Sequence, residues 1–479
     1  MWIIATILIY FAVLLAISRL TQHRATNDIF FRANRQSPWY MVAFGMVGAS
    51  ISGVTFVSVP GMVLTSQMTY LQVCLGFIVG YLAVAFVLLP VYYKLNLTSI
   101  YAYLGQRLGQ RSYHTGAWFF LLSKMVGASV KFYVVCMILQ QFVCDALGVP
   151  FALTVSVMVL LIWLYTRKGG VRTLVFTDMF QTLCLFSALL LIIYMVMRQL
   201  DFSLMDAVRA VAGDERSRIF VMDQWQSPHY FWKQFLSGAF IVIVMTGLDQ
   251  DMMQKNLTCC TLREAQKDMC SYGLAFVPAN MLFMALGILL AQLFERQGMA
   301  IPAKGDELLP FYVENTSSII PLTSYLFTLG IVAASFSSAD SALTSLTTSY
   351  CVDIKGRADD ERLRKHAHLA ICALFVVFIL LFHQFNHTSL IDAIYTIVSY
   401  TYGPLLGLFA FGLFTRRQVH DRWVPLVCVA SPLICYAADY WAQQQWNYHF
   451  GYELLMVNGL LTFVALRLLA RSAGCQTSS

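Results

Sequence analysis

The sequence predicts an all-α polytopic membrane protein of about 13 transmembrane helices. Two features of its composition support this fold class: 58% of the 479 residues are hydrophobic, and only 12% are charged. Because a soluble protein needs about 25% charged residues, lipid must cover much of this surface. The net charge of +7 does not indicate a nucleic-acid partner, because the basic residues are dispersed over short loops and not gathered on one face.

Long apolar runs follow one another along the chain, each near the length that crosses a hydrocarbon core of ~30 Å. They lie at about 1–20, 38–64, 70–95, 116–145, 150–167, 173–199, 231–254, 271–295, 320–352, 366–385, 389–415, 423–441 and 450–472. The first run lacks the basic start and the small-residue cleavage site of a signal peptide, so we expect a retained helix. The 12 cysteines show no metal-type or redox spacing and predict no disulfide framework.

The distribution of basic residues predicts the orientation of the chain, because cytoplasmic loops of membrane proteins carry an excess of Lys and Arg. With the N-terminus outside and the C-terminus in the cytoplasm, most of the 32 basic residues fall in cytoplasmic loops, Lys255 among them. Lys124 and Lys131 fall inside a span. We therefore expect a multi-pass protein of the cell (inner or plasma) membrane with this topology.

The second and the seventh apolar runs are interrupted by glycine. The second reads MVAFGMVGASISGVTFVSVPG (41–61), and the seventh reads FLSGAFIVIVMTGLDQDMMQ (235–254). Backbone unwinds inside a membrane only where it lines a polar cavity, because lipid cannot satisfy free N–H and C=O groups. A matching pair of interrupted spans is typical of a transporter built from two inverted repeats. The alternative is that the glycines only permit close helix packing.

These observations divide the chain into five parts. An N-terminal extra helix and a cytoplasmic loop (1–37) precede a first inverted repeat of five helices (38–199). An extracellular loop (200–230) leads to a second repeat of five helices (231–415), and two C-terminal helices and a tail (416–479) follow.

The ninth run carries small hydroxyl residues on one helix face. In GIVAASFSSADSALTSLTTSY, Ala334, Ser337, Ser338 and Ser341 recur at helical spacing. Sodium is a hard cation, and hard cations prefer oxygen ligands, which hydroxyls and freed carbonyls supply. The pattern therefore indicates a sodium site, although small hydroxyl residues are also typical of tight helix packing.

Acidic residues inside the spans favour a cation site over mere packing. Asp178 lies near the start of the sixth run, and Asp340 lies within the serine face. Carboxylates inside a membrane are costly and mark ion or proton pathways. Asp249 and Asp251 are weaker candidates, because they approach the cytoplasmic boundary, where water solvates them.

Two lysines share one face of the fourth span, because Lys124 and Lys131 are spaced i, i+7. A buried ammonium group needs a counter-charge. The lysines therefore either bind an anionic solute or pair with Asp178 or Asp340, and pairing is the favoured interpretation.

At these motifs the sequence resembles the sodium:solute symporter family, which includes sodium–glucose, proline, pantothenate, sialic-acid and choline transporters. The resemblance covers nearly the whole chain through GASISG (48–53), TSIYAYLGQRLG (98–109), GGVRTLVFTDMFQ (169–181), GLDQDMMQKNL (247–257), AASFSSADS (333–341) and YGPLLGLFAFGLFTRR (402–417). Each motif alone is weak, but their order and spacing together are specific. The resemblance implies a leucine-transporter-type 5+5 inverted-repeat core from about 38 to 415, with one helix before it and two after.

The resemblance also implies where the coupling ion binds. The family's conserved sodium site maps to Gly48, Ile51, Ala334, Ser337 and Ser338. A second cation site, found in some members, maps to Asp178, Ser337, Asp340 and Ser341, and Asp340 stands where some relatives have Ser. We therefore expect Na+ as the coupling ion and no organic cofactor.

Helix placement alone gives candidates for contact with the solute: Ser50, Ser52, Thr55, Gln72, Lys124 and Tyr400. A sugar is not favoured, because Val242 and Met245 stand where some sugar transporters have polar or aromatic groups.

The sequence thus predicts a secondary active transporter that couples inward sodium movement to uptake of a small organic solute by alternating access. Beyond the solute and the lipid bilayer, no obligate protein partner is inferred. Proton-coupled symport through Asp178 and Asp340 is the alternative mechanism. A channel would differ by a flux too fast for alternating access, and a membrane-embedded enzyme is disfavoured because no nucleophile–base motif lies at a membrane boundary.

Overall fold

The chain folds almost entirely into helices, which confirms the predicted all-α class. The computed structural model describes residues 2–21, 26–223, 225–316, 320–385, 398–446, 448 and 450–471. Two short strands, β1 (Gln418–Val419) and β2 (Ala470–Arg471), pair antiparallel. Residues 386–397, which include the start of the predicted span at 389–415, lie outside the described residues.

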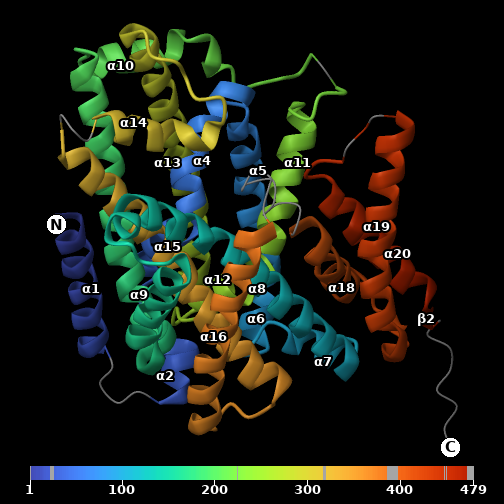
Figure 1. Ribbon diagram of the computed structural model, residues 1–479. Helices are drawn as coiled ribbons and strands as arrows, with labels where there is room; N and C mark the ends of the chain where they lie inside the picture. The colour runs from blue at the N-terminus through green and yellow to red at the C-terminus, as the bar shows by residue number, and fades with distance from the viewer. Residues whose placement is uncertain are drawn as a thin grey trace, which may run out of the picture.

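The helices of the first half are α1 (Trp2–Thr21), α2 (Asn27–Arg32), α3 (Trp39–Ser50), α4 (Gly53–Ser66), α5 (Tyr70–Ala83), α6 (Leu89–Lys94), α7 (Ala102–Arg107), α8 (Gln110–Leu139), α9 (Phe151–Gln199) and α10 (Leu204–Gly213). Those of the second half are α11 (Phe231–Val242), α12 (Gln250–Asn256), α13 (Leu262–Gln297), α14 (Leu308–Thr316), α15 (Leu322–Ser349), α16 (Glu361–Phe385), α18 (Gly403–Phe414), α19 (Val424–Trp446) and α20 (Leu454–Leu468). The short helices α2 and α7 lie at one end of the molecule and α10 lies at the other (Figure 1).

Both glycine-interrupted runs are broken helices, as the sequence predicts. α3 and α4 meet at an angle of 62° across the two residues between them, where Ile51 and Ser52 leave the helical conformation. α11 continues through a π-helical turn to Gly247 and then meets α12 at 69°. Each break frees backbone groups deep in the molecule, which only a polar interior can satisfy.

Among the described residues, seven helices are long and apolar enough to cross a membrane, or up to nine if each bent pair is one span. Three shorter apolar helices, Ala5–Thr21, Val398–Phe414 and Leu454–Leu468, add to these. The predicted spans at 150–167 and 173–199 form the single 49-residue helix α9, interrupted by non-helical backbone at Gly170. The total of about 13 spans therefore stays a prediction.

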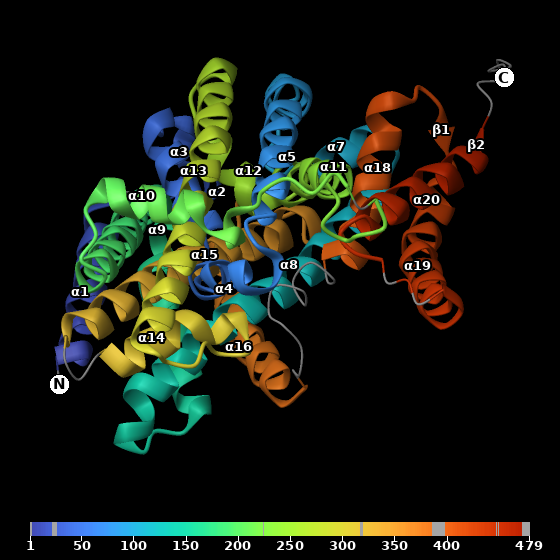
Figure 2. The same ribbon diagram turned by 90° about the horizontal axis from the view of Figure 1, so that it is seen from above.

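The broken helices lie inside a shell of long helices. α9 packs against α15, α3 and α1, while α13 covers α4 and α5. Seen from above, α1 lies at one side of the molecule and α19 and α20 lie at the other (Figure 2). This arrangement brings α15, with its serine face, against the break between α3 and α4.

Glycine also permits the close approach of α5 and α11. A Cβ atom at Gly76 would lie 2.0 Å from the carbonyl oxygen of Phe235, and one at Gly238 would lie 2.2 Å from that of Val73. Packing therefore explains Gly238, whereas unwinding explains the non-helical backbone at Ile51 and Ser52. The two interpretations of the glycines both hold, at different positions.

Candidate functional site

The serine face of α15 contacts the break in the first broken helix. The hydroxyl of Ser338 donates to the carbonyl oxygen of Ala49 at 2.8 Å and also to that of Ala334, one turn back on α15, at 3.2 Å. Ala49 lies one residue from the end of α3. The structure thus joins the two segments that supply the predicted sodium ligands.

The predicted sodium residues Gly48, Ile51, Ala334, Ser337 and Ser338 offer only neutral oxygens, namely carbonyls and hydroxyls. Ile51 is fully buried, and its backbone has left the α-helix with φ −80° and ψ 88°. Close packing surrounds the site, because a Cβ atom at Gly48 would lie 1.9 Å from the hydroxyl of Thr182 on α9. This donor set is of the kind that hard cations prefer.

The residues predicted for a second cation site lie one turn further along α15 and on α9. Ser337 donates to Oδ1 of Asp178 at 2.7 Å. The other carboxylate oxygen, Oδ2, lies 2.7 Å from the ammonium group of Lys255 on α12. Lys255, which the sequence places in a cytoplasmic loop, is in fact buried, with 2% of its side chain exposed. That expectation is wrong because the 69° bend turns α12 into the interior.

Asp340 is fully buried and is held by two hydroxyl groups. Tyr165 on α9 donates to its Oδ2 at 2.7 Å, and Ser341 donates to its Oδ1 at 3.3 Å. Hydroxyl donors stabilise a buried carboxylate without adding charge. Of the predicted second set, Ser337 is thus bound to Asp178, and Ser341 is bound to Asp340.

Lys124 does not pair with Asp178 or Asp340, so the favoured sequence interpretation is wrong. Its ammonium group lies 3.1 Å from Asp249 and 2.6 Å from Asp251. These two carboxylates are not solvated at a boundary, as expected from the sequence, because they are only 2% and 3% exposed. The bend before α12 carries them to the middle of the molecule, opposite α8.

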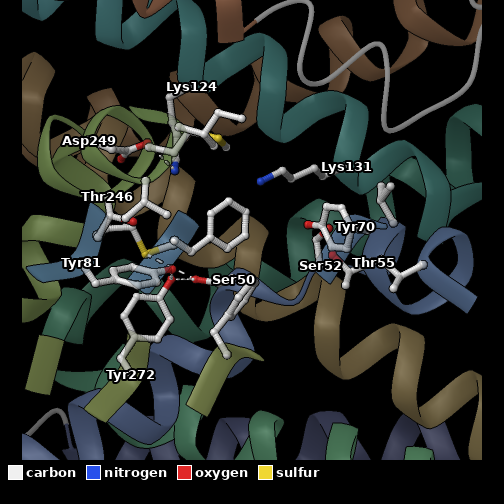
Figure 3. A pocket seen from close by; sticks show the side chains of 18 residues that line it. Ser50, Ser52, Thr55, Tyr70, Tyr81, Lys124, Lys131, Thr246, Asp249 and Tyr272 are labelled. Carbon is white, nitrogen blue, oxygen red and sulfur yellow. Dashed lines mark hydrogen bonds and ion pairs between the residues drawn. The ribbon is translucent and has the colours of Figure 1, made fainter. Parts of the chain in front are cut away.

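A cavity of about 120 Å³ opens beside the broken helices. Its walls come from the break between α3 and α4 and from α5, α8, α11, α12 and α13 (Figure 3). Its polar lining residues are Ser50, Ser52, Thr55, Tyr70, Tyr81, Lys124, Lys131, Thr246, Asp249 and Tyr272. Val242 and Met245 add apolar surface. An apolar lining with a few convergent polar groups is typical of sites for small organic molecules.

Four of the predicted solute-contacting residues line this cavity: Ser50, Ser52, Thr55 and Lys124. The other two are not among its lining residues. Gln72 is fully buried and binds the carbonyl of His229 and the side chain of Gln234, both at 2.9 Å. The carbonyl of Tyr400 accepts a bond from Asn458 on α20 at 3.1 Å.

Tyrosines form a polar wall that sequence reasoning missed. Tyr81 donates to the hydroxyl of Tyr272 at 2.8 Å, and Tyr272 in turn contacts the hydroxyl of Ser50. In Figure 3 these groups face the cavity from one side, and Ser52, Thr55 and Tyr70 lie on the other. No periodicity marks Tyr81 or Tyr272 within its apolar helix.

A sequence signal for the buried position of Lys255 was present, because three charges follow a glycine break in GLDQDMMQKNL.

A family model described as the sodium:solute symporter family matches residues 30–421. The chain belongs to this family. The sodium/sialic acid symporter NanT of Aliivibrio fischeri is 25% identical over 422 residues, which cover 83% of this chain and 79% of NanT. The sodium/iodide cotransporter of Homo sapiens is 22% identical over 407 residues, which cover 82% of this chain and 61% of that protein.

A solved structure of a Na+-coupled sialic acid symporter, in a substrate-bound outward-open state, is similar over 98% of this chain and 99% of its own. The TM-score is 0.85 at 20% identity, which confirms the leucine-transporter-type fold. As a member of the sodium:solute symporter family, the chain is a membrane transporter and not an enzyme. It is a secondary transporter of a small organic solute, with Na+ as the coupling ion.

Proposed function

We propose that this symporter uses inward sodium movement to drive uptake of a small organic anion. The observation that supports an anionic solute is the position of Lys131. Its amine projects into the cavity between the two polar walls (Figure 3). Within the described part of the chain, Lys131 makes no ion pair, whereas Lys124 on the same helix binds two carboxylates. A carboxylate on the solute would supply the missing counter-charge.

The remaining lining residues suit the rest of such a solute. Ser52, Thr55 and Tyr70 offer hydroxyl groups on the side of Lys131, and Val242 and Phe276 offer apolar surface. Specific sites are mostly apolar, with a few polar groups that fix orientation. The relatives agree with a negative charge, because sialic acid is an acid and iodide is an anion.

The mechanism proposed is alternating access in the cell membrane, with the N-terminus outside and the C-terminus in the cytoplasm. Sodium binds Gly48, Ile51, Ala334, Ser337 and Ser338 from the outside and stabilises the break beside the solute cavity. The repeats 38–199 and 231–415 then move relative to each other and expose both ligands to the cytoplasm. Each sodium ion that crosses a potential of ~100 mV contributes about 2.3 kcal/mol. The entry of one negative charge against the same potential costs the same amount, so the sodium concentration gradient drives accumulation of a monoanion.

The test is uptake into proteoliposomes with an imposed inward sodium gradient. A panel of radiolabelled carboxylic acids is compared with the corresponding neutral amides. We expect sodium-dependent accumulation of at least one acid and not of its amide. Accumulation that follows a proton gradient in sodium-free buffer would favour proton-coupled symport instead.

Lys131→Gln tests the role of the lysine in the same vesicles. Loss of one charge-assisted hydrogen bond costs about 1.5–3 kcal/mol, so the acid should bind roughly 10- to 150-fold more weakly. Lys131→Arg keeps the charge and should retain part of the affinity, and the exposed Lys365→Gln is the matched control. Unchanged affinity for the acid in Lys131→Gln would refute the assignment.

A further inference from the structure

The ion pair between Lys255 and Asp178 lies where the sequence predicts a second cation. We propose that the ammonium group of Lys255 takes the place of a second sodium ion, so that this symporter couples one sodium ion to each solute. The inference rests on the proposed function for the first sodium site, and it changes the expectation that Asp178 and Asp340 bind a mobile cation.

Both oxygens of Asp178 are already engaged. Lys255 Nζ lies 2.7 Å from Oδ2, and the hydroxyl of Ser337 lies 2.7 Å from Oδ1. The side chains of Lys255 and Asp178 are 2% and 1% exposed, so water does not compete for either charge. The lysine is therefore a full counter-ion in the interior, where an unpaired carboxylate would be very costly.

The oxygens of Asp340 are engaged as well, by Tyr165 and Ser341. A sodium ion could reach Asp178 only by displacing the ammonium group or by lying beside it. Two charges of the same sign at contact distance repel each other far more strongly in the protein interior than in water. The arrangement thus excludes a second sodium ion as long as Lys255 stays in place.

Lys255 is held in place by its helix. All seven residues of α12 are buried, and the flanking side chains are fixed. Gln254 donates to the carbonyl of Phe31 and to the hydroxyl of Thr348, each at 2.8 Å, and Asn256 donates to the carbonyl of Ala265 at 3.0 Å. Because Lys255 is part of the chain, its charge cannot cross the membrane with the solute. It therefore transfers no energy from the sodium gradient to solute uptake.

The number of coupled sodium ions determines how strongly the solute can be accumulated. For a neutral solute, one sodium ion supplies roughly fifty-fold accumulation at ~100 mV before its concentration gradient is added, and a second ion would square that factor. A solute with one negative charge, carried with one sodium ion, would move without net charge. The tethered lysine therefore predicts electroneutral uptake of a monoanion.

The test is equilibrium binding of radiolabelled Na+ alone to the purified full chain, with no solute present. We expect one ion per wild-type chain and its loss in Ser338→Ala, since Ser338 belongs only to the first site. Two ions per wild-type chain, one of them lost in Asp178→Asn, would overturn the inference and leave the first sodium site standing. No bound ion in the wild type would overturn the proposed sodium site as well.

Lys255→Met tests whether the lysine occupies a cation position. Without the ammonium group, Asp178 and Ser337 are free to bind sodium, so the variant should bind two ions. The matched control, Asp178→Asn with Lys255→Met, removes both charges and should return to one ion. A single ion in a folded Lys255→Met chain would contradict the proposal, and the wild-type count decides it if that variant does not fold.

Discussion

Replacing Lys124 by methionine should destabilise the protein strongly, because it leaves two carboxylates without their cation. The ammonium group lies 3.1 Å from Asp249 and 2.6 Å from Asp251, and the three side chains are 13%, 3% and 4% exposed. Removing one partner of a buried ion pair costs about 3–5 kcal/mol, mostly through the charge left behind. We expect a loss of this size in the free energy of unfolding.

A double-mutant cycle on the purified protein measures this effect through thermal and denaturant unfolding. Asp251→Asn should restore a large part of the stability of Lys124→Met, because the remaining carboxylate of Asp249 still accepts a bond from Tyr402 at 2.8 Å. Lys131→Met removes a lysine of the same helix that makes no ion pair with any described residue, so this control should cost much less. The reasoning fails if Lys124→Met loses less than about 1 kcal/mol, or if Asp178→Asn rescues it equally well.

Two further predictions concern the sodium site and the helix packing. Ser337→Ala with Ser338→Ala should raise the sodium concentration for half-maximal uptake by about tenfold or more, as expected for a loss of at least ~1.4 kcal/mol. Ser345→Ala, whose hydroxyl donates to the carbonyl of Ala342 on the same helix at 2.9 Å, should not. Unchanged sodium dependence in the double variant would exclude the assigned ligands. Gly238→Val should prevent the approach of α5 and α11, because a Cβ atom there would lie 2.2 Å from a backbone carbonyl oxygen, and a normally stable, active variant would show that this contact is dispensable.

The broken helices and the serine face could be predicted from the sequence because both depend on local patterns. Glycines mark the break near Ile51 wherever the helix lies in the fold, and the helical spacing of Ala334, Ser337, Ser338 and Ser341 fixes their shared face. The structure adds only that Ser338 meets Ala49. Local sequence patterns were sufficient to predict these two features, because α3 and α15 both belong to the core.

The partners of the buried charges could not be predicted, because they depend on how α12 turns. Lys255 follows an apolar span, so the sequence predicts that it lies in a loop. The 69° bend instead places its ammonium group beside Asp178. The same bend sends Asp249 and Asp251 to Lys124. For Gln72, placement on a helix predicted the depth of the side chain and not its partners. The side chain bonds to Gln234 and is not among the residues that line the cavity.

The proposed sodium and solute sites share one unwound turn, which gives a physical basis for their coupling. Ser50 and Ser52 line the solute cavity, whereas the carbonyl of Ala49 accepts the bond from Ser338 at the sodium face. A ligand on either side must order the same few residues, so the first to bind lowers the ordering cost for the second. Linkage requires the effect to be mutual: sodium should raise solute affinity by the same factor by which solute raises sodium affinity. Because Ser50 also bonds to Tyr272 on the same wall of the cavity, Tyr272→Phe should reduce that factor while leaving sodium binding without solute nearly unchanged. Equal coupling in the variant and the wild type would show that the turn is ordered by other contacts.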